Sequence, residues 1–306
     1  MSATPGSSLH GALGPAASPL SGVRRTVADY FELTKPKVQT LLLFTTVATM
    51  EVAGDPPVSR IALTCLGGYL SAGGAGAVNH YWDRDLDAQM KRTADRPVPA
   101  GRVAPRSALI FGLALAVCSF LELSLTINLL AASLALSGFL GYVGVYTMWL
   151  KRRTPQNIVI GGAAGAIPPL VGWAATRGSV SWTAVYLFAI VFYWTPPHFW
   201  ALSLLMKDDY ERVGVPMMPV ARGERETRRQ IVLYALLLYA ISQLPFCAGG
   251  FGLPYLAASV VLGLVFVAGA VHLYRRADRR TALRLYLYSL AYLALLFGAM
   301  VLDAKL

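Results

Sequence analysis

Long apolar stretches separated by short polar segments run along almost the whole chain. A transmembrane helix needs about 20 apolar residues, within a range of about 17–25, and nine stretches approach that length. Because runs this long are typical of helices, the pattern predicts an all-α polytopic membrane protein with nine transmembrane helices. The stretches lie at residues 38–54, 60–82, 105–122, 124–148, 156–175, 181–205, 229–248, 251–273 and 282–302.

The positions of the basic residues predict how these helices are oriented. If the amino terminus is cytoplasmic, 24 of the 27 lysines and arginines lie in or beside cytoplasmic segments. The three on the outside are Arg60, Arg177 and Lys305. Cytoplasmic loops carry such an excess of positive charge, so the pattern predicts a cytoplasmic amino terminus and an external carboxyl terminus.

The composition supports a membrane protein and changes the meaning of the net charge. Of the 306 residues, 56% are hydrophobic and 14% are charged, against about 25% charged residues in soluble domains. This composition excludes an ordinary soluble enzyme and a disordered chain. A net charge of +11 would suit nucleic-acid binding in a soluble protein. Here the charge follows the membrane topology, so we expect membrane lipid and no nucleic acid as a partner.

The chain is predicted to consist of a short tail followed by one domain. Residues 1–22 are rich in Ser, Gly, Ala and Pro and contain no Lys or Arg, which predicts a disordered tail. Residues 23–306 form the predicted nine-helix domain, and its long cytoplasmic loops, 83–106 and 206–228, hold most of the acidic residues. Because an Arg-rich transit peptide is not evident, a bacterial inner membrane is favoured over the mitochondrial inner membrane.

Three oxygen-bearing side chains mark the end of the second predicted helix. Asn79, Asp83 and Asp87 are spaced four residues apart, which places them on one helix face within about 12 Å, while Asp85 points elsewhere. Such oxygen ligands suit Mg²⁺, which prefers one or two carboxylates together with phosphate oxygens. The cluster therefore predicts a metal site for a phosphorylated substrate. The alternative is a solvated loop in which the acids only offset nearby basic residues.

A second acidic cluster, residues 207–211, follows the sixth predicted helix on the same side of the membrane. Two acidic clusters facing one cavity would hold two or more Mg²⁺ ions on a diphosphate. Basic residues follow the first cluster and the fourth helix, and guanidinium groups match phosphate geometry. Alternatively, these residues only set the topology and contact lipid headgroups. They are Lys91, Arg92, Arg96, Lys151, Arg152 and Arg153.

These residues belong to a longer, ordered set of motifs. Asn79, Asp83 and Asp87 form an NxxxDxxxD pattern, and residues 92–97 follow as RTxxRP. Together they resemble the UbiA-type intramembrane prenyltransferases. Five further blocks make the sequence similar to the branch of that family that farnesylates haem. They are LTKPK (33–37), YT (146–147) with KR (151–152), TPQNIVIGG (154–162), WTPPHFWAL (194–202), and DDY (208–210) with GVPMMP (214–219).

The resemblance implies an electrophilic prenyl transfer. Farnesyl diphosphate would ionise, a vinyl group of protohaem IX (haem B) would attack the allylic cation, and water would complete the product, haem O. Mg²⁺ and basic side chains would stabilise the departing diphosphate. The farnesyl tail would occupy an apolar groove, near which Gly73, Gly74 and Gly76 let helices approach closely. The implied metal ligands are Asn79, Asp83, Asp87, Asp208 and Asp209, and the implied diphosphate contacts are Lys35, Arg92, Arg96, Lys151 and Arg152.

The resemblance also implies roles for two ring-bearing side chains, which complete the expected catalytic set with the first cluster. The Tyr146 ring would stabilise the allylic cation. His198, about two turns inside the sixth predicted helix, would contact the haem iron or assist proton handling, or else only hydrogen-bond to a neighbouring helix. One motif departs from the family pattern. Many relatives carry a second DxxxD, whereas Asp208 and Asp209 are adjacent, which leaves open which of them binds metal.

Other functions share part of this pattern. A UbiA-type enzyme acting on a quinone precursor or on chlorophyllide would have the acidic clusters but not the TPPHFWAL and NIVIGG blocks. A transporter would place charged groups near the middle of the bilayer, where this chain has almost none. A non-catalytic haem-binding assembly factor would not need paired acids with RTxxRP. The partners implied by the resemblance are haem B, farnesyl diphosphate, and a haem A synthase or a terminal oxidase assembly route.

Overall fold

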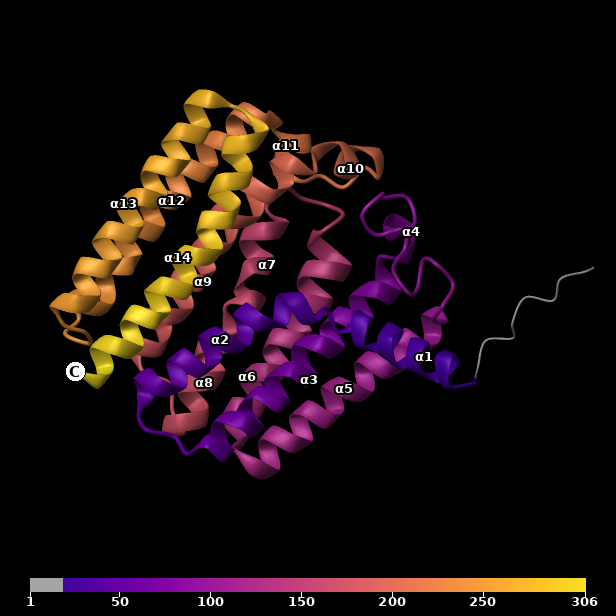
Figure 1. The fold of residues 1–306 in the computed structure, drawn as a ribbon, viewed down its shortest axis with the longest axis horizontal. Helices are drawn as coiled ribbons and strands as arrows, with labels where there is room; N and C mark the ends of the chain where they lie inside the picture. The colour runs from indigo at the N-terminus through magenta and orange to yellow at the C-terminus, as the bar shows by residue number, and fades with distance from the viewer. Residues whose placement is uncertain (1–18) are drawn as a thin grey trace, which may run out of the picture.

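The computed structural model describes residues 19–306, with side chains from residue 22 onward, and Figure 1 shows a bundle of long helices. Residues 19–306 contain no strand, which confirms the all-α prediction. The segment η1 is a π-helix that continues α6. The elements are α1 (Pro19–Leu33), α2 (Pro36–Ala53), α3 (Val58–Trp82), α4 (Arg84–Asp87), α5 (Pro105–Thr126), α6 (Leu129–Leu140), η1 (Gly141–Leu150), α7 (Asn157–Gly165), α8 (Ile167–Arg177), α9 (Trp182–Leu205), α10 (Lys207–Arg212), α11 (Met218–Ala221), α12 (Gly223–Cys247), α13 (Leu253–Arg276) and α14 (Arg279–Lys305).

Each apolar stretch predicted from the sequence falls on a helical segment. Within residues 19–306, seven segments are long and apolar enough to cross a membrane, and α6 with η1, and α7 with α8, each count as one. α2 and α9, which cover the predicted spans 38–54 and 181–205, do not reach that combination of length and hydropathy. The protein is therefore a polytopic α-helical membrane protein. The count of nine spans and the orientation of the termini stay predictions.

A helix that the apolar stretches did not predict, α1, precedes the first of them. It begins at Pro19, so residues 19–22 are helical rather than part of a disordered tail, while residues 1–18 lie outside the described residues. Proline suits the first position of a helix because its missing amide hydrogen has no intrahelical partner there. The apolar stretches do not predict α1 as a membrane-spanning helix because charged residues interrupt its apolar positions.

Glycines let α3 approach its neighbours, as the sequence predicts. A Cβ on Gly74 would lie 2.6 Å from the carbonyl oxygen of Gly112 in α5, and a Cβ on Gly112 would lie 2.7 Å from that of Gly74. The two backbones are therefore in contact, which is how small residues join helices without a hydrophobic driving force between them. Gly73 and Gly76 face the α1–α2 junction at Thr34 and Leu33 in the same way.

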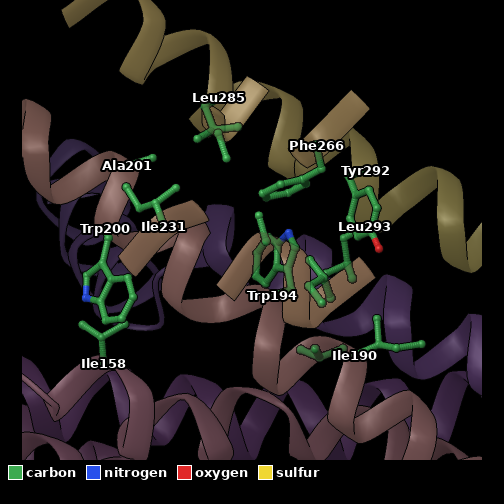
Figure 2. Packing of buried hydrophobic residues seen from close by; sticks show 14 of the residues in the cluster. Ile158, Ile190, Trp194, Trp200, Ala201, Ile231, Phe266, Leu285, Tyr292 and Leu293 are labelled. Carbon is green, nitrogen blue, oxygen red and sulfur yellow. The ribbon is translucent and has the colours of Figure 1, made fainter. Parts of the chain in front are cut away.

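The largest buried cluster surrounds α9. Figure 2 shows Trp194 of α9 beside Phe266 of α13 and Leu293 of α14, while Trp200 points toward Ile158 of α7. This packing joins α9 to α7, α13 and α14. The short helices α4, α10 and α11 lie at one end of the bundle, away from the carboxyl terminus (Figure 1). The charged motifs are therefore gathered at that end.

Candidate active site

The first acidic cluster lies where α3 ends and α4 begins. Asp83 occupies the turn between the two helices. The amides of Asp83 and Asp87 donate to the carbonyls of Asn79 and Asp83, at 2.9 and 2.8 Å. The helical register continues through the junction, so the three side chains share one face, as their spacing predicts. All three are buried, and Asp83 is only 1% exposed.

A chain of hydrogen bonds joins this face to other parts of the bundle. Lys35, between α1 and α2, donates to Oδ1 of Asn79 at 2.5 Å. The Asn79 amide donates to Asp83 at 2.6 Å and to Thr147 in η1 at 3.2 Å. Lys151, directly after η1, donates to the same Asp83 oxygen, Oδ2. Because these partners come from distant parts of the chain, the cluster is a buried tertiary network rather than a solvated loop.

Lys35 reaches the network from a strained backbone position. Its φ of 55° lies in the left-handed region, which costs a non-glycine residue about 1–3 kcal/mol and persists only where the surroundings fix it. Gly76 lets α3 approach the backbone just before Lys35, because a Cβ there would lie 3.0 Å from the carbonyl oxygen of Leu33. Burial, followed by the positive charges of Arg96 and Lys151, lowers the pKa of Lys35 to about 7.

Two arginines bind carboxylates of the same loop. Arg96 donates to Asp87 at 2.8 Å. Arg152 binds Asp85 with both terminal nitrogens at 2.7 Å, and its Nη2 lies 3.6 Å from Asp83. The hydrogen bond from Arg152 lowers the pKa of Asp85. The Asp85 side chain is 55% exposed, so it points away from the buried face, as the sequence predicts.

The chemistry of the donor atoms fits a hard cation. Oδ1 of Asp83 is buried and accepts no hydrogen bond from the described residues. A buried acceptor without a partner costs about 1–3 kcal/mol, and carboxylate oxygens are ligands that Mg²⁺ prefers. Asp83 and Asp87, with the Asn79 amide beside them, therefore fit a magnesium ion. Basic side chains around them leave a surplus of positive charge that suits an anionic ligand.

The second acidic cluster is not gathered with the first. In the part of the chain that the structure describes, no three Asp, Glu, His or Cys side chains could hold a metal together. Asp209 pairs with Arg212 of its own helix, α10, at 3.1 Å. Asp208 is exposed and lines a separate hollow of about 620 Å³ beside Lys207 and Glu224. The predicted convergence of both clusters on one diphosphate is therefore absent from this structure.

Helix geometry explains why the adjacent acids do not both turn inward. Successive residues of a helix diverge by about 100°, so Asp208, Asp209 and Tyr210 cannot face one site together. The Tyr210 side chain points into the protein and is 5% exposed. Burial raises its pKa, while the nearby charges of Arg92 and Arg96 lower it. Tyr210 is thus a site residue that the motifs contained but to which they gave no role.

An apolar groove opens beside Lys35. Its empty space, including the solvent at its mouth, is about 910 Å³. Lys35 and Tyr142 lie at its polar end, and the remaining lining comes from α2, α3, α6, α7 and α8, with Leu42, Ala75, Phe139 and Val171 among the apolar side chains. A long apolar chain with an anionic end would match both the groove and the charge beside it.

Comparison with known proteins shows to which family the chain belongs. The UbiA prenyltransferase family matches residues 41–296 of the chain. The chain belongs to this family. It is 56% identical over 280 residues to a protoheme IX farnesyltransferase of Thermus thermophilus, and 55% identical over 283 residues to one of Symbiobacterium thermophilum; each match covers 91% of this chain. The chain spans 46% of the Thermus protein but 95% of the Symbiobacterium protein.

Solved structures of UbiA proteins share the fold. A structure described for digeranylgeranylglyceryl phosphate synthase matches with a TM-score of 0.76 and 19% identity, over 92% of this chain and 100% of that one. A UbiA homologue from Archaeoglobus fulgidus, bound to DMAPP and Mg²⁺, matches with a TM-score of 0.67 and 14% identity, over 89% of this chain and 99% of that one. At such identities the likeness shows the fold alone.

Within this UbiA fold, Tyr146 lies beside the network. Its ring is 5.3 Å from that of Tyr142, which lines the groove. Gly161 of α7 makes room for the ring, because a Cβ there would lie 2.5 Å from Tyr146 Cδ2. Thr147, the next residue, holds the Asn79 amide. The YT block of the sequence therefore contributes one side chain to the network and one to its wall.

His198 lies elsewhere in the UbiA bundle. Its Nδ1 is 2.6 Å from the hydroxyl of Ser289 in α14. Its ring stacks between those of Trp194, at 4.2 Å, and Tyr286, at 4.9 Å. The contacts with Ser289 and Tyr286 join α9 to α14, the contact with Trp194 lies within α9, and none of the three is with a residue of the buried network. The hydrogen bond to a neighbouring helix, one of the alternatives from the sequence, is the contact that His198 makes here.

Proposed function

We propose that the protein transfers the farnesyl group of farnesyl diphosphate to a vinyl group of protohaem IX, with addition of water, to give haem O. One observation carries the proposal: a buried, positively charged oxygen-rich site adjoins an apolar groove. The similarity to proteins named protoheme IX farnesyltransferase supports the acceptor. Family membership supports prenyl transfer as the class of reaction.

The basic side chains bind the diphosphate and stabilise the charge that develops on it. Lys35 donates to Asn79 and Lys151 donates to Asp83, while Arg96 and Arg152 are more exposed than the acids that they bind at Asp87 and Asp83. The positive charge of Arg92 acts on Tyr210 and lowers the pKa of its hydroxyl. Fixed charges at a site of low dielectric stabilise a developing anion without reorganising at the moment of reaction, and one such group contributes about 2.7–4 kcal/mol.

Asn79, Asp83 and Asp87 would hold Mg²⁺ against the diphosphate, while Asp208 and Asp209 would act only if α10 moved. Bound there, Mg²⁺ would supply Lewis-acid stabilisation of the leaving group. The side chains of this chain do the remaining work of orientation. Lys35 donates to Asn79 and Lys151 donates to Asp83, and these bonds hold the acceptor side chains in place.

The groove holds the farnesyl chain with its first carbon near Lys35 and Tyr142. As the C1–O bond breaks, the electron pair leaves with the diphosphate and positive charge develops on the allylic carbons. Tyr146 presents an aromatic ring next to this position, and an aromatic face attracts a cation. The apolar walls, including Phe139 and Ala75, exclude water from the cation before the acceptor reaches it.

The acceptor completes the reaction outside the groove. The vinyl π electrons form the new carbon–carbon bond to C1, and the positive charge passes to the vinyl carbon next to the porphyrin ring. Water adds its oxygen there and releases one proton, which leaves a hydroxyethylfarnesyl group. His198 would contact haem through Nε2, since its Nδ1 is bound to Ser289. We place the protein in a bacterial inner membrane, supplying a haem A synthase or terminal oxidase assembly.

The proposal is tested with purified protein in lipid, haem B, farnesyl diphosphate and Mg²⁺, with products read by mass spectrometry. We expect a hydroxyethylfarnesyl adduct that disappears with EDTA and in Asp83→Ala. Asp85→Ala is the matched control, because Asp85 lies two residues away but is exposed. Prenylation of a quinone precursor instead of haem would retain the family reaction and overturn the acceptor. No turnover with any acceptor, and no binding of farnesyl diphosphate, would overturn the enzyme itself.

A further inference from the structure

Helix α1 has three distinct sides. One side packs on the protein: Asp29 and Leu33 are buried, and the Tyr30 ring meets Phe111 of α5 edge-on at 5.0 Å. A second side is polar and carries Arg25 and Glu32, both exposed. The third side lies between them and is apolar.

The apolar side is exposed although its residues are large. Val23, Val27 and Phe31 are 62%, 64% and 56% exposed. They are spaced four residues apart, so they form one stripe along the helix. Arg24 borders this stripe and makes no ion pair with any residue in the range 19–306. A helix with a protein side, an apolar exposed side and a basic polar side matches a helix lying in a lipid–water interface.

The position of α1 agrees with that environment. In Figure 1 it crosses the direction of α3 and α5 near the end of the bundle that carries α4. Ile110, next to the Phe111 that Tyr30 touches, is 67% exposed on the membrane-spanning helix α5. The exposed stripe therefore continues an apolar surface that lipid covers.

We propose that α1 is an interfacial helix inserted in the surface of a bilayer that contains anionic phospholipid. We further propose that this insertion positions the active site. The second half of the proposal rests on the proposed function. The stripe of Val23, Val27 and Phe31 enters the boundary between headgroups and acyl chains, and Arg24 and Arg25 meet the phosphates.

Two connections lead from α1 to the site. Asp29 accepts a hydrogen bond from Arg102 at 2.7 Å, and Arg102 donates to the Asp95 carbonyl at 2.9 Å. This fixes the loop after α4, which carries Arg92 and Arg96. The second connection is direct, because α1 ends at Leu33 and only Thr34 separates it from Lys35, whose left-handed backbone leaves little freedom to compensate for a shift of α1.

The insertion of α1 into the bilayer interface is tested by fluorescence quenching. Cys65, Cys118 and Cys247 are replaced by alanine, and a polarity-sensitive fluorophore is attached after Val27→Cys or, as control, Ala28→Cys on the polar side. The protein is placed in vesicles of phosphatidylcholine and phosphatidylglycerol. We expect shallow doxyl lipids to quench the label at position 27 and aqueous iodide to quench it at position 28. Equal iodide quenching at both positions would overturn the proposal, as would protection of position 27 from both quenchers, the result expected from a second copy or residues 1–18.

The link to the active site has its own readout. Val27→Asp should raise the KM for farnesyl diphosphate about tenfold, because a small displacement of Lys35 weakens its contact, while Ala28→Asp leaves it unchanged. Val27→Ser provides a milder variant, expected to shift the KM in the same direction. An unchanged KM in both Val27 variants would overturn the link between α1 and the active site, even if quenching confirms that α1 is inserted in the bilayer interface. Loss of all turnover in the unmodified protein would instead count against the proposed function and leave the quenching result intact.

Discussion

The two acidic segments of this protein look equivalent in sequence and differ in the folded chain. At residues 79–87 the carboxylates of Asp83 and Asp87 are buried and bound by Lys151 and Arg96, and Lys35 binds the adjoining Asn79. At residues 207–211 the acids lie near the surface, and Asp209 pairs with Arg212 of its own helix. Both segments follow an apolar stretch on the same predicted side of the membrane. Burial and tertiary partners, which spacing does not show, make the first segment the stronger candidate for chemistry.

The difference also shows what a buried acid requires. A buried carboxylate without a partner is strongly unfavourable, so Asp83 is accompanied by Lys151 and Asn79. Asp208 needs no ion-pair or hydrogen-bond partner because it is exposed and water solvates it. The contrast predicts a gradient of mutational effects, which runs from the buried network outward.

The largest effect should come from removing charge at Asp83. Asp83→Asn should lower the rate of farnesyl transfer by at least about 100-fold, since it removes one electrostatic contact from a preorganised site. Asp85→Asn should lower it by no more than about fivefold, because an exposed ion pair contributes about 1 kcal/mol or less. Both rates are measured from product formation by mass spectrometry. Equal losses in the two variants would break the contrast between buried and exposed acids.

A smaller effect should come from crowding Tyr146. Gly161→Ala places a methyl group where the Tyr146 ring lies, so the ring must move, and we expect the rate to fall about tenfold. Gly144→Ala is the matched control in η1, since a Cβ there meets nothing within 4 Å. The comparison is made by kcat at saturating farnesyl diphosphate. If both glycine variants keep the full rate, the position of the Tyr146 ring does not matter for catalysis.

The third prediction separates Tyr210 from the acids that precede it. Tyr210→Ala should lower the rate by several-fold, up to about tenfold, because it opens the wall beside Arg92 and Arg96. Tyr210→Phe should retain most of the rate, since the ring and its packing remain. Initial rates in the same lipid vesicles provide the measurement. A larger loss in Asp208→Asn than in Tyr210→Ala would reverse the order proposed for this segment.

The smallest effect should come from Asp209. Asp209→Asn removes a pair with Arg212 within one short helix, and such a pair contributes about 0.2–0.5 kcal/mol to stability. Turnover should stay within about twofold and the melting temperature nearly unchanged. A thermal shift assay and the product assay check both quantities. A loss as large as that of Asp83→Asn would restore the second cluster as a metal site.

Much of the fold was predictable because it depends on local hydropathy. The helices appear where the apolar stretches lie, and the four-residue spacing of Asn79, Asp83 and Asp87 is kept across the junction of α3 and α4. α1 was not predicted, because Arg24, Arg25 and Asp29 interrupt its apolar positions. Its helical conformation is stabilised by packing of one side on α3 and α5, which no single-segment pattern reveals.

The candidate site was predictable in part, through motifs rather than through geometry. The resemblance assigned Lys35, Arg96, Lys151 and Arg152 to one site, and the structure places all four around the first cluster. The motifs did not separate Tyr210 from its acidic neighbours. The choice of which side chain of α10 turns inward depends on how that short helix docks against the rest of the bundle.

The apolar runs and the motifs were enough to predict the class of the protein, the places of its long apolar helices and the shared face of the first acidic cluster. Those properties follow from the length and periodicity of apolar runs, which act within a segment of about 20 residues. The folded chain was needed to show which acids are buried, which lysine binds which oxygen, and where an apolar groove adjoins the charge. These features depend on contacts between residues far apart in the chain, and helix packing, rather than local preference, sets such contacts.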